Sequence, residues 1–162
     1  MIDLRAYKLM AVMACGLAMA GCSSGSPATF SVSSAEVDSS YACPVAASNS
    51  PYDLHGSISA HNGTSNAVAI TSVSATLTLA AVNGGWLEKV GDKYDAGNVT
   101  VSPTSVDAGG NATLAVTVPS ACTGRTAKGT VASGDYAVTF TIVTSAGTFK
   151  VDSRDRHRIV TA

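Results

Sequence analysis

The chain has 162 residues, a formal net charge of −1 and only 13% charged residues. These values give no indication of a nucleic-acid partner or a strongly acidic substrate, and the length fits one domain. Ser, Thr, Val and Ala are frequent, whereas the strong helix formers Glu, Lys, Arg and Gln are scarce. This balance favours strands over helices.

The first 28 residues have the pattern of a targeting segment followed by a tether. Arg5 and Lys8 precede residues 9–20, an uncharged run that fits the core of a signal peptide and is too short to span a bilayer. Small residues directly precede Cys22. The next six positions, residues 23–28, are small, polar and interrupted by proline, which is typical of a short tether. We therefore expect the folded domain to begin near residue 29.

Residues 19–22, Met-Ala-Gly-Cys, resemble the cleavage site of bacterial lipoprotein signal peptides, with Met19 where that family more often has Leu. The resemblance implies removal of residues 1–21 and a lipidated Cys22, with palmitate-like acyl chains that anchor the protein to a membrane of the cell envelope. Ser23, in place of the Asp that retains some lipoproteins at the inner membrane, favours the outer membrane if the source is Gram-negative. The alternative is an ordinary secretory signal that is cleaved nearby.

The cysteines agree with export. Cys15 lies in the signal segment and Cys22 is assigned to lipid, so Cys43 and Cys122 are left to form a disulfide in an oxidising compartment. Such a bond closes a loop of about 80 residues, for which the chain-entropy model gives about 4 to 5 kcal/mol. The alternative, a pair of metal-ligating thiolates, lacks the close CxxC spacing and a nearby His.

Alternating patterns predict strands in the first half of the domain. Residues 29–37 form a first strand, residues 38–53 a loop, and residues 54–61 a strand with one solvated face. After a turn, residues 67–82 form a long β-prone segment. Its side-chain phase reverses near residues 71–72, which predicts a bulge or a crossing between sheets.

The second half is more varied. Residues 83–98 have no regular pattern, and a short strand with Val99 and Val101 follows. A loop over 103–111 precedes a clear strand over 112–118, which Pro119 is expected to end.

Three further strands are predicted towards the C-terminus. Residues 127–132 suggest a short one, and residues 136–143 alternate most cleanly, with Tyr136, Val138, Phe140 and Ile142 on one face. A turn at 144–147 leads into a strand over 148–153. The last segment, residues 154–158, is charged and reads as a solvated edge.

Short strands separated by turn residues predict two packed antiparallel sheets. Residues 110–119 and 133–138 (Ser-Gly-Asp-Tyr-Ala-Val) also look like adjoining strand motifs of bacterial immunoglobulin-like modules. The resemblance implies an all-β, immunoglobulin-like antiparallel β-sandwich of about 7–9 strands over residues 29–162. It also implies that Tyr136 fills a tyrosine corner, with its hydroxyl bonded to the backbone upstream. The positions of Trp86 and of both domain cysteines do not match the antibody-type disulfide.

Histidines and a nucleophile-like string offer weak signals for chemistry. His55 and His61 share a strand face but lie about 20 Å apart if the strand is straight, which is too far to share a metal ion. We expect both to be exposed, and His157 to belong to the charged edge. The G-x-S-x-G string at residues 21–25 straddles the cleavage site, where a strand-to-helix nucleophile turn cannot form.

The irregular segment 83–98 holds the main candidates for ligand binding. Asp92 and Asp95 could supply oxygens to Ca²⁺, although the spacing of a calcium loop is missing. Trp86 and Tyr94 could form a stacking platform for sugar rings, against the alternative that Trp86 packs in the core.

The sequence therefore predicts a lipid-anchored envelope protein with a binding or structural β-sandwich and no enzymatic activity, cofactor or metal. Its partners would be the membrane, through Cys22, and an envelope protein or polysaccharide. The alternatives are an accessory protein that binds glycan or metal through residues 83–98, or a small envelope hydrolase.

Overall fold

The computed structural model describes residues 29–124 and 131–161, which form strands and no helix. Residue 162 and the segments 1–28 and 125–130, which include Cys22 and the G-x-S-x-G string, lie outside the described residues. Ten strands are present in the described part of the chain: β1 (Phe30–Val37), β2 (Ser40–Cys43), β3 (Ser50–Asn62), β4 (Val68–Asn83), β5 (Lys93–Ser102), β6 (Ser105–Val106), β7 (Asn111–Cys122), β8 (Ala132–Thr144), β9 (Gly147–Asp152) and β10 (His157–Thr161).

The strands form two sheets that β5 joins. One sheet has the order β1-β3-β7-β5, and the other has the order β5-β4-β8, with β9 and β10 both pairing β8. β5 changes sheets along its length, because it pairs β4 between residues 93 and 99 and pairs β7 along residues 100–102. With β1, β3, β4, β7 and β8 as strands A, B, C, E and F, this is the A-B-E-D and C-F-G arrangement of an immunoglobulin-like sandwich. The predicted fold class is confirmed.

The core lies between the sheets and follows the predicted alternation. Every second residue of β8 from Ala132 to Thr144 is buried, including all four of the apolar positions predicted to face inward. The largest fully buried side chains come from both sheets: Leu54 and Ile58 of β3, Leu114 and Val118 of β7, Leu77 and Leu79 of β4, and Phe140 and Ile142 of β8.

The predicted phase reversal in β4 is a register shift. Ile70 pairs with Thr144 while Ser72 pairs with the adjacent Val143, so one residue of β4 is extra at this point. A single extra residue turns the following side chains to the opposite face. A second shift occurs between Leu79 and Ala81.

Three short strands and several strand ends differ from the prediction. β2, β6 and the start of β3 lie in segments predicted as loops, β5 begins within the segment predicted as irregular, and β10 begins within the segment predicted as a charged edge. β2 and β10 pair in parallel at the edge of the sheet, where two short strands give little alternation to detect. β7 continues past Pro119 to Cys122, because β5 accompanies it only along residues 115–117 and a strand without a neighbour on one side tolerates proline.

Asn62 closes one end of the sandwich. Its side chain is fully buried, and its Nδ2 donates to the carbonyl oxygens of Asn66, Val106 and Asp107 at 2.8, 3.0 and 3.1 Å. Its Oδ1 accepts from the backbone N–H and the hydroxyl of Thr64 at 3.0 and 2.7 Å. The turn after β3 and the segment after β6 are therefore held together by one saturated amide. β1 begins at this end, since Phe30 pairs with Asn62.

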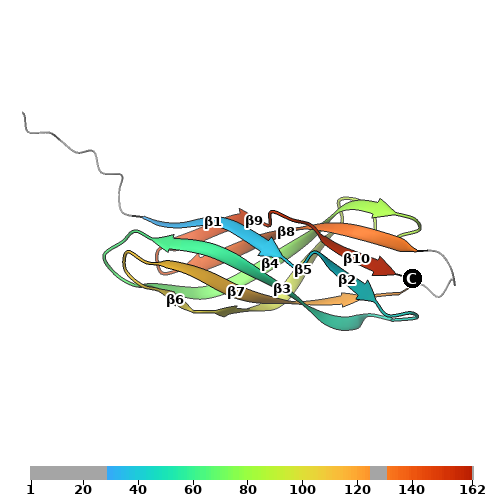
Figure 1. The fold of residues 1–162 in the computed structure, drawn as a ribbon, viewed down its shortest axis with the longest axis horizontal. Helices are drawn as coiled ribbons and strands as arrows, with labels where there is room; N and C mark the ends of the chain where they lie inside the picture. Colours follow the sequence, from blue (N-terminus) through green and yellow to red (C-terminus); the bar gives the residue numbers. More distant parts are fainter. Residues whose placement is uncertain (1–28, 125–130, 162) are drawn as a thin grey trace, which may run out of the picture.

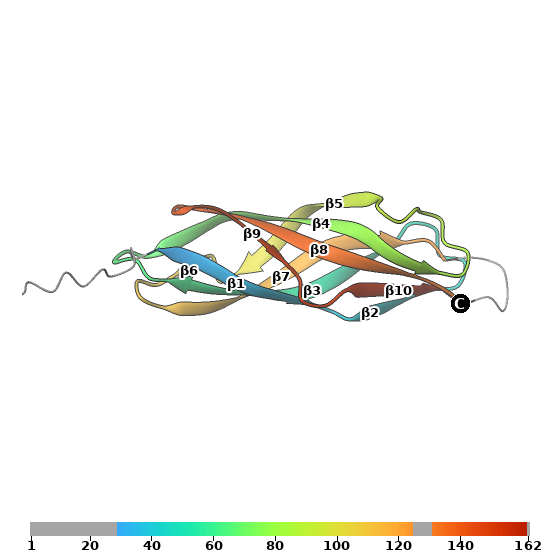
Figure 2. The same cartoon turned by 90° about the horizontal axis from the view of Figure 1, so that it is seen from above.

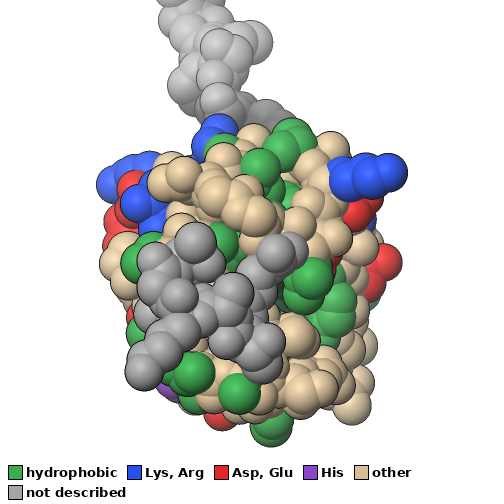
Figure 3. Space-filling model, turned by 90° about the vertical axis from the view of Figure 1, so that its right-hand side faces the viewer, with side chains coloured by type: hydrophobic (Ala, Val, Ile, Leu, Met, Phe, Trp, Pro, Cys, Tyr) green, Lys and Arg blue, Asp and Glu red, His purple; other side chains and the backbone are tan. Residues whose placement is uncertain are grey.

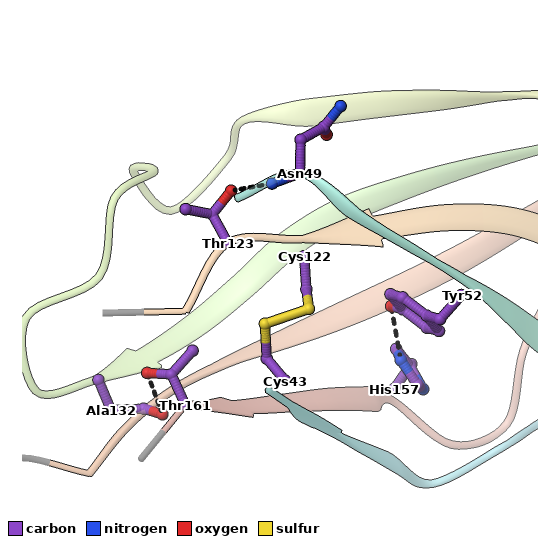
Figure 4. The surroundings of a disulfide bond; sticks show 8 residues. All are labelled: Cys43, Asn49, Tyr52, Cys122, Thr123, Ala132, His157 and Thr161. Atoms are coloured by element: carbon purple, nitrogen blue, oxygen red, sulfur yellow. Dashed lines mark hydrogen bonds between the residues drawn. A yellow bond between two sulfur atoms is a disulfide. The ribbon is translucent and has the colours of Figure 1, made fainter. Parts of the chain in front are cut away.

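The other end is cross-linked by the predicted disulfide. Cys43 at the end of β2 is joined to Cys122 at the end of β7, with Cα atoms 6.0 Å apart. The bond connects the two sheets, as Figure 4 shows. Figures 1 and 2 show an elongated sandwich in which the chain enters at one end and β10 finishes at the other.

Candidate binding site at the tip of the sandwich

A pocket of about 200 Å³ opens at the disulfide end of the sandwich. We call it the tip pocket. Side chains from both sheets and from three loops line it, and they include three aromatic residues, one carboxylate and several small polar groups: Asn49, Trp86, Leu87, Glu88, Tyr94, Ala121, Cys122, Thr123, Tyr136, Ile159 and Thr161.

The position of Trp86 is fixed by its contacts with β8. Its indole lies so close to Gly134 that a Cβ added there would come within 2.6 to 2.8 Å of three indole atoms. Its Nε1 donates to the Tyr136 hydroxyl at 3.1 Å. Trp86 is half-buried against the margin of the core. It therefore packs against the core and lines the pocket at once, so each of the two alternatives drawn from the sequence describes part of its role.

Tyr136 links Trp86 to Glu88. Its hydroxyl accepts from the indole and donates to the Glu88 carboxylate. Burial raises the pKa of Tyr136 far above its usual value, and the hydrogen bond to Glu88 raises it further, so this phenol stays protonated as a donor. The tyrosine-corner prediction is wrong in its partner. The hydroxyl bonds side chains of the loop after β4 instead of backbone, because that loop folds over the start of β8.

Tyr94 reaches the same pocket from β5. It pairs with Leu77 of β4 and remains 45% exposed. The structure thus places Trp86 and Tyr94, the two residues proposed from sequence as a sugar platform, on one pocket. Sequence reasoning missed Glu88, Thr123 after β7 and Thr161 of β10, since their approach depends on the pairing of strands far apart in the chain.

The pocket is acidic in character. Glu88 is its only carboxylate, and no Lys, Arg or His is among the lining residues of the described chain. Asn49, Thr123 and Thr161 add neutral polar atoms. The Thr123 hydroxyl accepts from the Asn49 backbone N–H at 3.1 Å, as Figure 4 shows.

Exposed apolar side chains gather around the tip pocket. The described residues contain seven exposed large hydrophobic side chains, and Val143 is the one far from this end. Leu87 and Tyr94 line the pocket itself, and Leu87 is 64% exposed. Figure 3 looks onto this end and shows hydrophobic side chains spread over it. The tip group consists of Val45, Val82, Leu87, Val90, Tyr94 and Val131.

The other candidates have structural partners. His55 and His61 are exposed on β3, as expected, and their Nδ1 atoms lie 3.2 Å from an Asp38 oxygen and 3.0 Å from Asn111 Oδ1. Asp92 accepts from the backbone N–H of Lys89, and Asp95 accepts from Thr76. Among residues 29–124 and 131–161, no three His, Cys, Asp or Glu side chains are grouped as a metal ion requires.

His157 contradicts the prediction of a solvated position. It is 1% exposed, and its two ring nitrogens lie 2.7 Å from the Asp38 carbonyl oxygen and 3.0 Å from the Tyr52 hydroxyl. Its neighbours Arg154 and Arg158 do face solvent, where they pair with Glu36 and Asp135. The strand alternation of β10 turns His157 inward between the exposed Arg156 and Arg158. The burial of His157 could not be predicted from sequence, because its neighbours in the chain are charged.

Comparisons with known proteins establish no family for this chain. No protein-family description matches the sequence, and no curated protein matches it. Among solved structures, the chain is similar to AggA, the major subunit of aggregative adherence fimbriae type I of Escherichia coli, with 10% identity over 82% of this chain and 95% of AggA and a TM-score of 0.37.

Two further similarities are more distant. The PapD-like domain 7 of human CEP192 is 16% identical over 99% of this chain and 97% of that domain, with a TM-score of 0.31. The VesB protease of Vibrio cholerae is 14% identical over 78% of this chain and 32% of VesB, with a TM-score of 0.24. At these values none of the three assigns a function. No helix in the described segments is long and apolar enough to cross a membrane.

Proposed function

We propose that the protein is a non-enzymatic binding module of a bacterial cell envelope, held to a membrane by lipid on Cys22 and presenting the tip pocket to an envelope polysaccharide or protein. The observation that carries this proposal is the concentration of exposed apolar side chains around the pocket. Soluble domains rarely leave large apolar patches exposed unless they bind something there.

The orientation of the domain supports the proposal. The first strand starts at Phe30, at the end closed by Asn62, and the pocket opens at the opposite end (Figures 1 and 2). A tether of residues 23–28 reaches roughly 20 Å when extended. A lipid on Cys22 would therefore hold the Asn62 end near the membrane and point the pocket outward.

The lining of the pocket supports binding more than catalysis. Its carboxylate is engaged by the protonated phenol of Tyr136, and beside its threonine hydroxyls the described lining holds no histidine and no second carboxylate. The three histidines lie elsewhere, two of them exposed on β3 and one enclosed by Tyr52 and Asp38. The Tyr136 hydroxyl and the Glu88 carboxylate do lie within hydrogen-bonding distance, but the raised pKa of Tyr136 disfavours the phenolate that a nucleophile would require.

Site-specific photo-crosslinking in intact cells tests the binding role. A photoreactive residue at Leu87 should give adducts with an envelope component, whereas the same residue at Val143, exposed at the far end, should not. Equal adducts at both positions, or none at Leu87, would overturn the proposal.

The anchor has its own test. Protein extracted from membranes should begin at Cys22 and carry the mass of the acyl chains, and Cys22→Ser should release it to the soluble fraction. An unmodified N-terminus at any other residue would refute lipidation.

A further inference from the structure

The tip pocket offers two kinds of contact to a ligand. One is a carboxylate held in place beside aromatic side chains, and the other is a set of neutral polar groups next to an apolar wall. We propose that the pocket binds a single sugar ring that carries a free amine, that is, an amino sugar without an acetyl group. This inference rests on the binding function proposed above and names its ligand.

The carboxylate selects for positive charge. Glu88 is held by the Tyr136 hydroxyl, which is itself held by Trp86, so the carboxylate is fixed before a ligand arrives. The hydrogen bond from Tyr136 occupies one of its acceptor positions, and others remain for an ammonium group. Trp86 and Tyr94 stand close by, and aromatic rings attract cations. No basic side chain among the described lining residues competes for Glu88.

The remaining lining suits the ring of a sugar. Sugars present apolar C–H faces to aromatic side chains and hydroxyl groups to amides and hydroxyls, and the pocket offers Trp86 and Tyr94 for the first and Asn49, Thr123 and Thr161 for the second. Its volume of about 200 Å³ is below the roughly 300 to 1,000 Å³ of sites for drug-sized ligands. One ring is therefore the natural occupant.

The fluorescence of Trp86 gives a direct measurement, because it is the only tryptophan in the chain. The folded protein is titrated with glucosamine, N-acetylglucosamine, choline and Nα-acetyl-lysine amide at matched ionic strength. Glucosamine should change the emission saturably. N-acetylglucosamine has the ring without the charge, whereas choline and blocked lysine have the charge without the ring. Each of these three should bind at least about tenfold more weakly.

Two variants locate the binding. Glu88→Gln keeps an acceptor for Tyr136 and removes the charge, so it should weaken glucosamine at least about tenfold and leave N-acetylglucosamine unchanged. Tyr94→Ala alters an exposed side chain and should weaken both sugars. Glu36→Gln, the same chemical change in a residue outside the pocket, should have no effect. Denaturation curves for each variant show that the comparison is made on folded protein.

Several results would overturn the inference. These are equal affinity for the acetylated sugar, no effect of Glu88→Gln, no saturable response to glucosamine, or binding of choline or blocked lysine as tight as that of glucosamine. Crosslinks at Leu87 would survive any of these results, so the binding function and the identity of its ligand can fail separately.

Discussion

The two ends of the sandwich are built on opposite principles. At the end where the chain enters, Asn62 satisfies three carbonyl groups and a turn with one buried amide. At the tip, a disulfide joins the sheets, and beside it lies an open pocket with exposed apolar side chains. At the first end the polar groups are hydrogen-bonded to one another and close the fold. At the tip, polar and apolar side chains remain accessible to a ligand.

This contrast suggests that the Asn62 end contributes mainly to stability and the tip mainly to binding. Buried polar groups that are fully hydrogen-bonded fix one arrangement of the chain, and losing a partner is costly. Exposed apolar groups around a pocket contribute little to folding. We therefore expect substitutions at the Asn62 end to unfold the protein, and substitutions on the rim of the tip to spare folding and impair binding.

The largest effect should come from the disulfide at the tip. Replacing both cysteines (Cys43→Ala with Cys122→Ala) frees a segment with a sequence separation of 79. The chain-entropy model puts the loss at about 4 to 5 kcal/mol of unfolding free energy. Urea denaturation of the double variant measures it. A loss below about 1 kcal/mol would mean that the tip is held by packing alone, and the contrast between the ends would weaken.

Asn62→Ala should be the next most damaging change. It leaves carbonyl groups of Asn66, Val106 and Asp107 without their shared donor, so we expect a loss of about 3 kcal/mol. Asn111→Ala, which removes an exposed amide bonded to His61, is the matched control and should cost less than about 0.5 kcal/mol. Similar losses in the two variants would show that the buried amide has no special role.

Gly134→Ala should damage the pocket more than the fold. The new methyl group would lie 2.6 to 2.8 Å from the Trp86 indole, which must move away. We expect a loss of about 1 to 2 kcal/mol from the crowding, and a shift of tryptophan emission towards that of an exposed indole. Gly97→Ala is the control, since an added Cβ there meets nothing within 4 Å. Unchanged emission in Gly134→Ala would contradict the described contact.

Alkaline pH should destabilise the fold without mutation, through two buried tyrosines on the tip side of the sandwich. Burial raises the pKa of Tyr52 to about 12, and the pKa of Tyr136 is raised as well. Folding favours the protonated phenol of each. Their contribution to stability is therefore complete below the unfolded value of about 10 and is lost as the pH rises through the folded value. Denaturation curves between about pH 9 and 12 should show this decline, with a smaller slope in Tyr136→Phe. An equal slope in that variant would argue against the shift.

The sequence predicted the sandwich well because alternation reports burial directly. The core face of β8 and the phase reversal of β4 both follow from a period of two. Positions defined by strand partners distant in sequence could not be inferred. From the sequence, Asn62 is expected in a solvated turn and His157 in a solvated charged segment, but both side chains are buried. Trp86 and Tyr94 can be predicted as binding residues because aromatic side chains in an irregular segment often contact ligands. Glu88 cannot, because its role depends on the hydrogen bond from Tyr136, which is distant in sequence.

Polar substitutions in the tip group should have the smallest effect on stability and the clearest effect on binding. Leu87→Ser combined with Val90→Ser removes apolar side chains that are 64% and 59% exposed, so the unfolding free energy should change by less than about 0.5 kcal/mol. Val143→Ser, at 37% exposure and far from the tip, is the control. The double variant should lose most of its crosslinked product in intact cells, measured from a photoreactive residue at Val131, which is exposed at the tip outside the pocket lining, whereas the control should keep it. If the double variant retained crosslinking, Leu87 and Val90 of the tip group would not contribute to binding, and the partner would contact other residues of the tip.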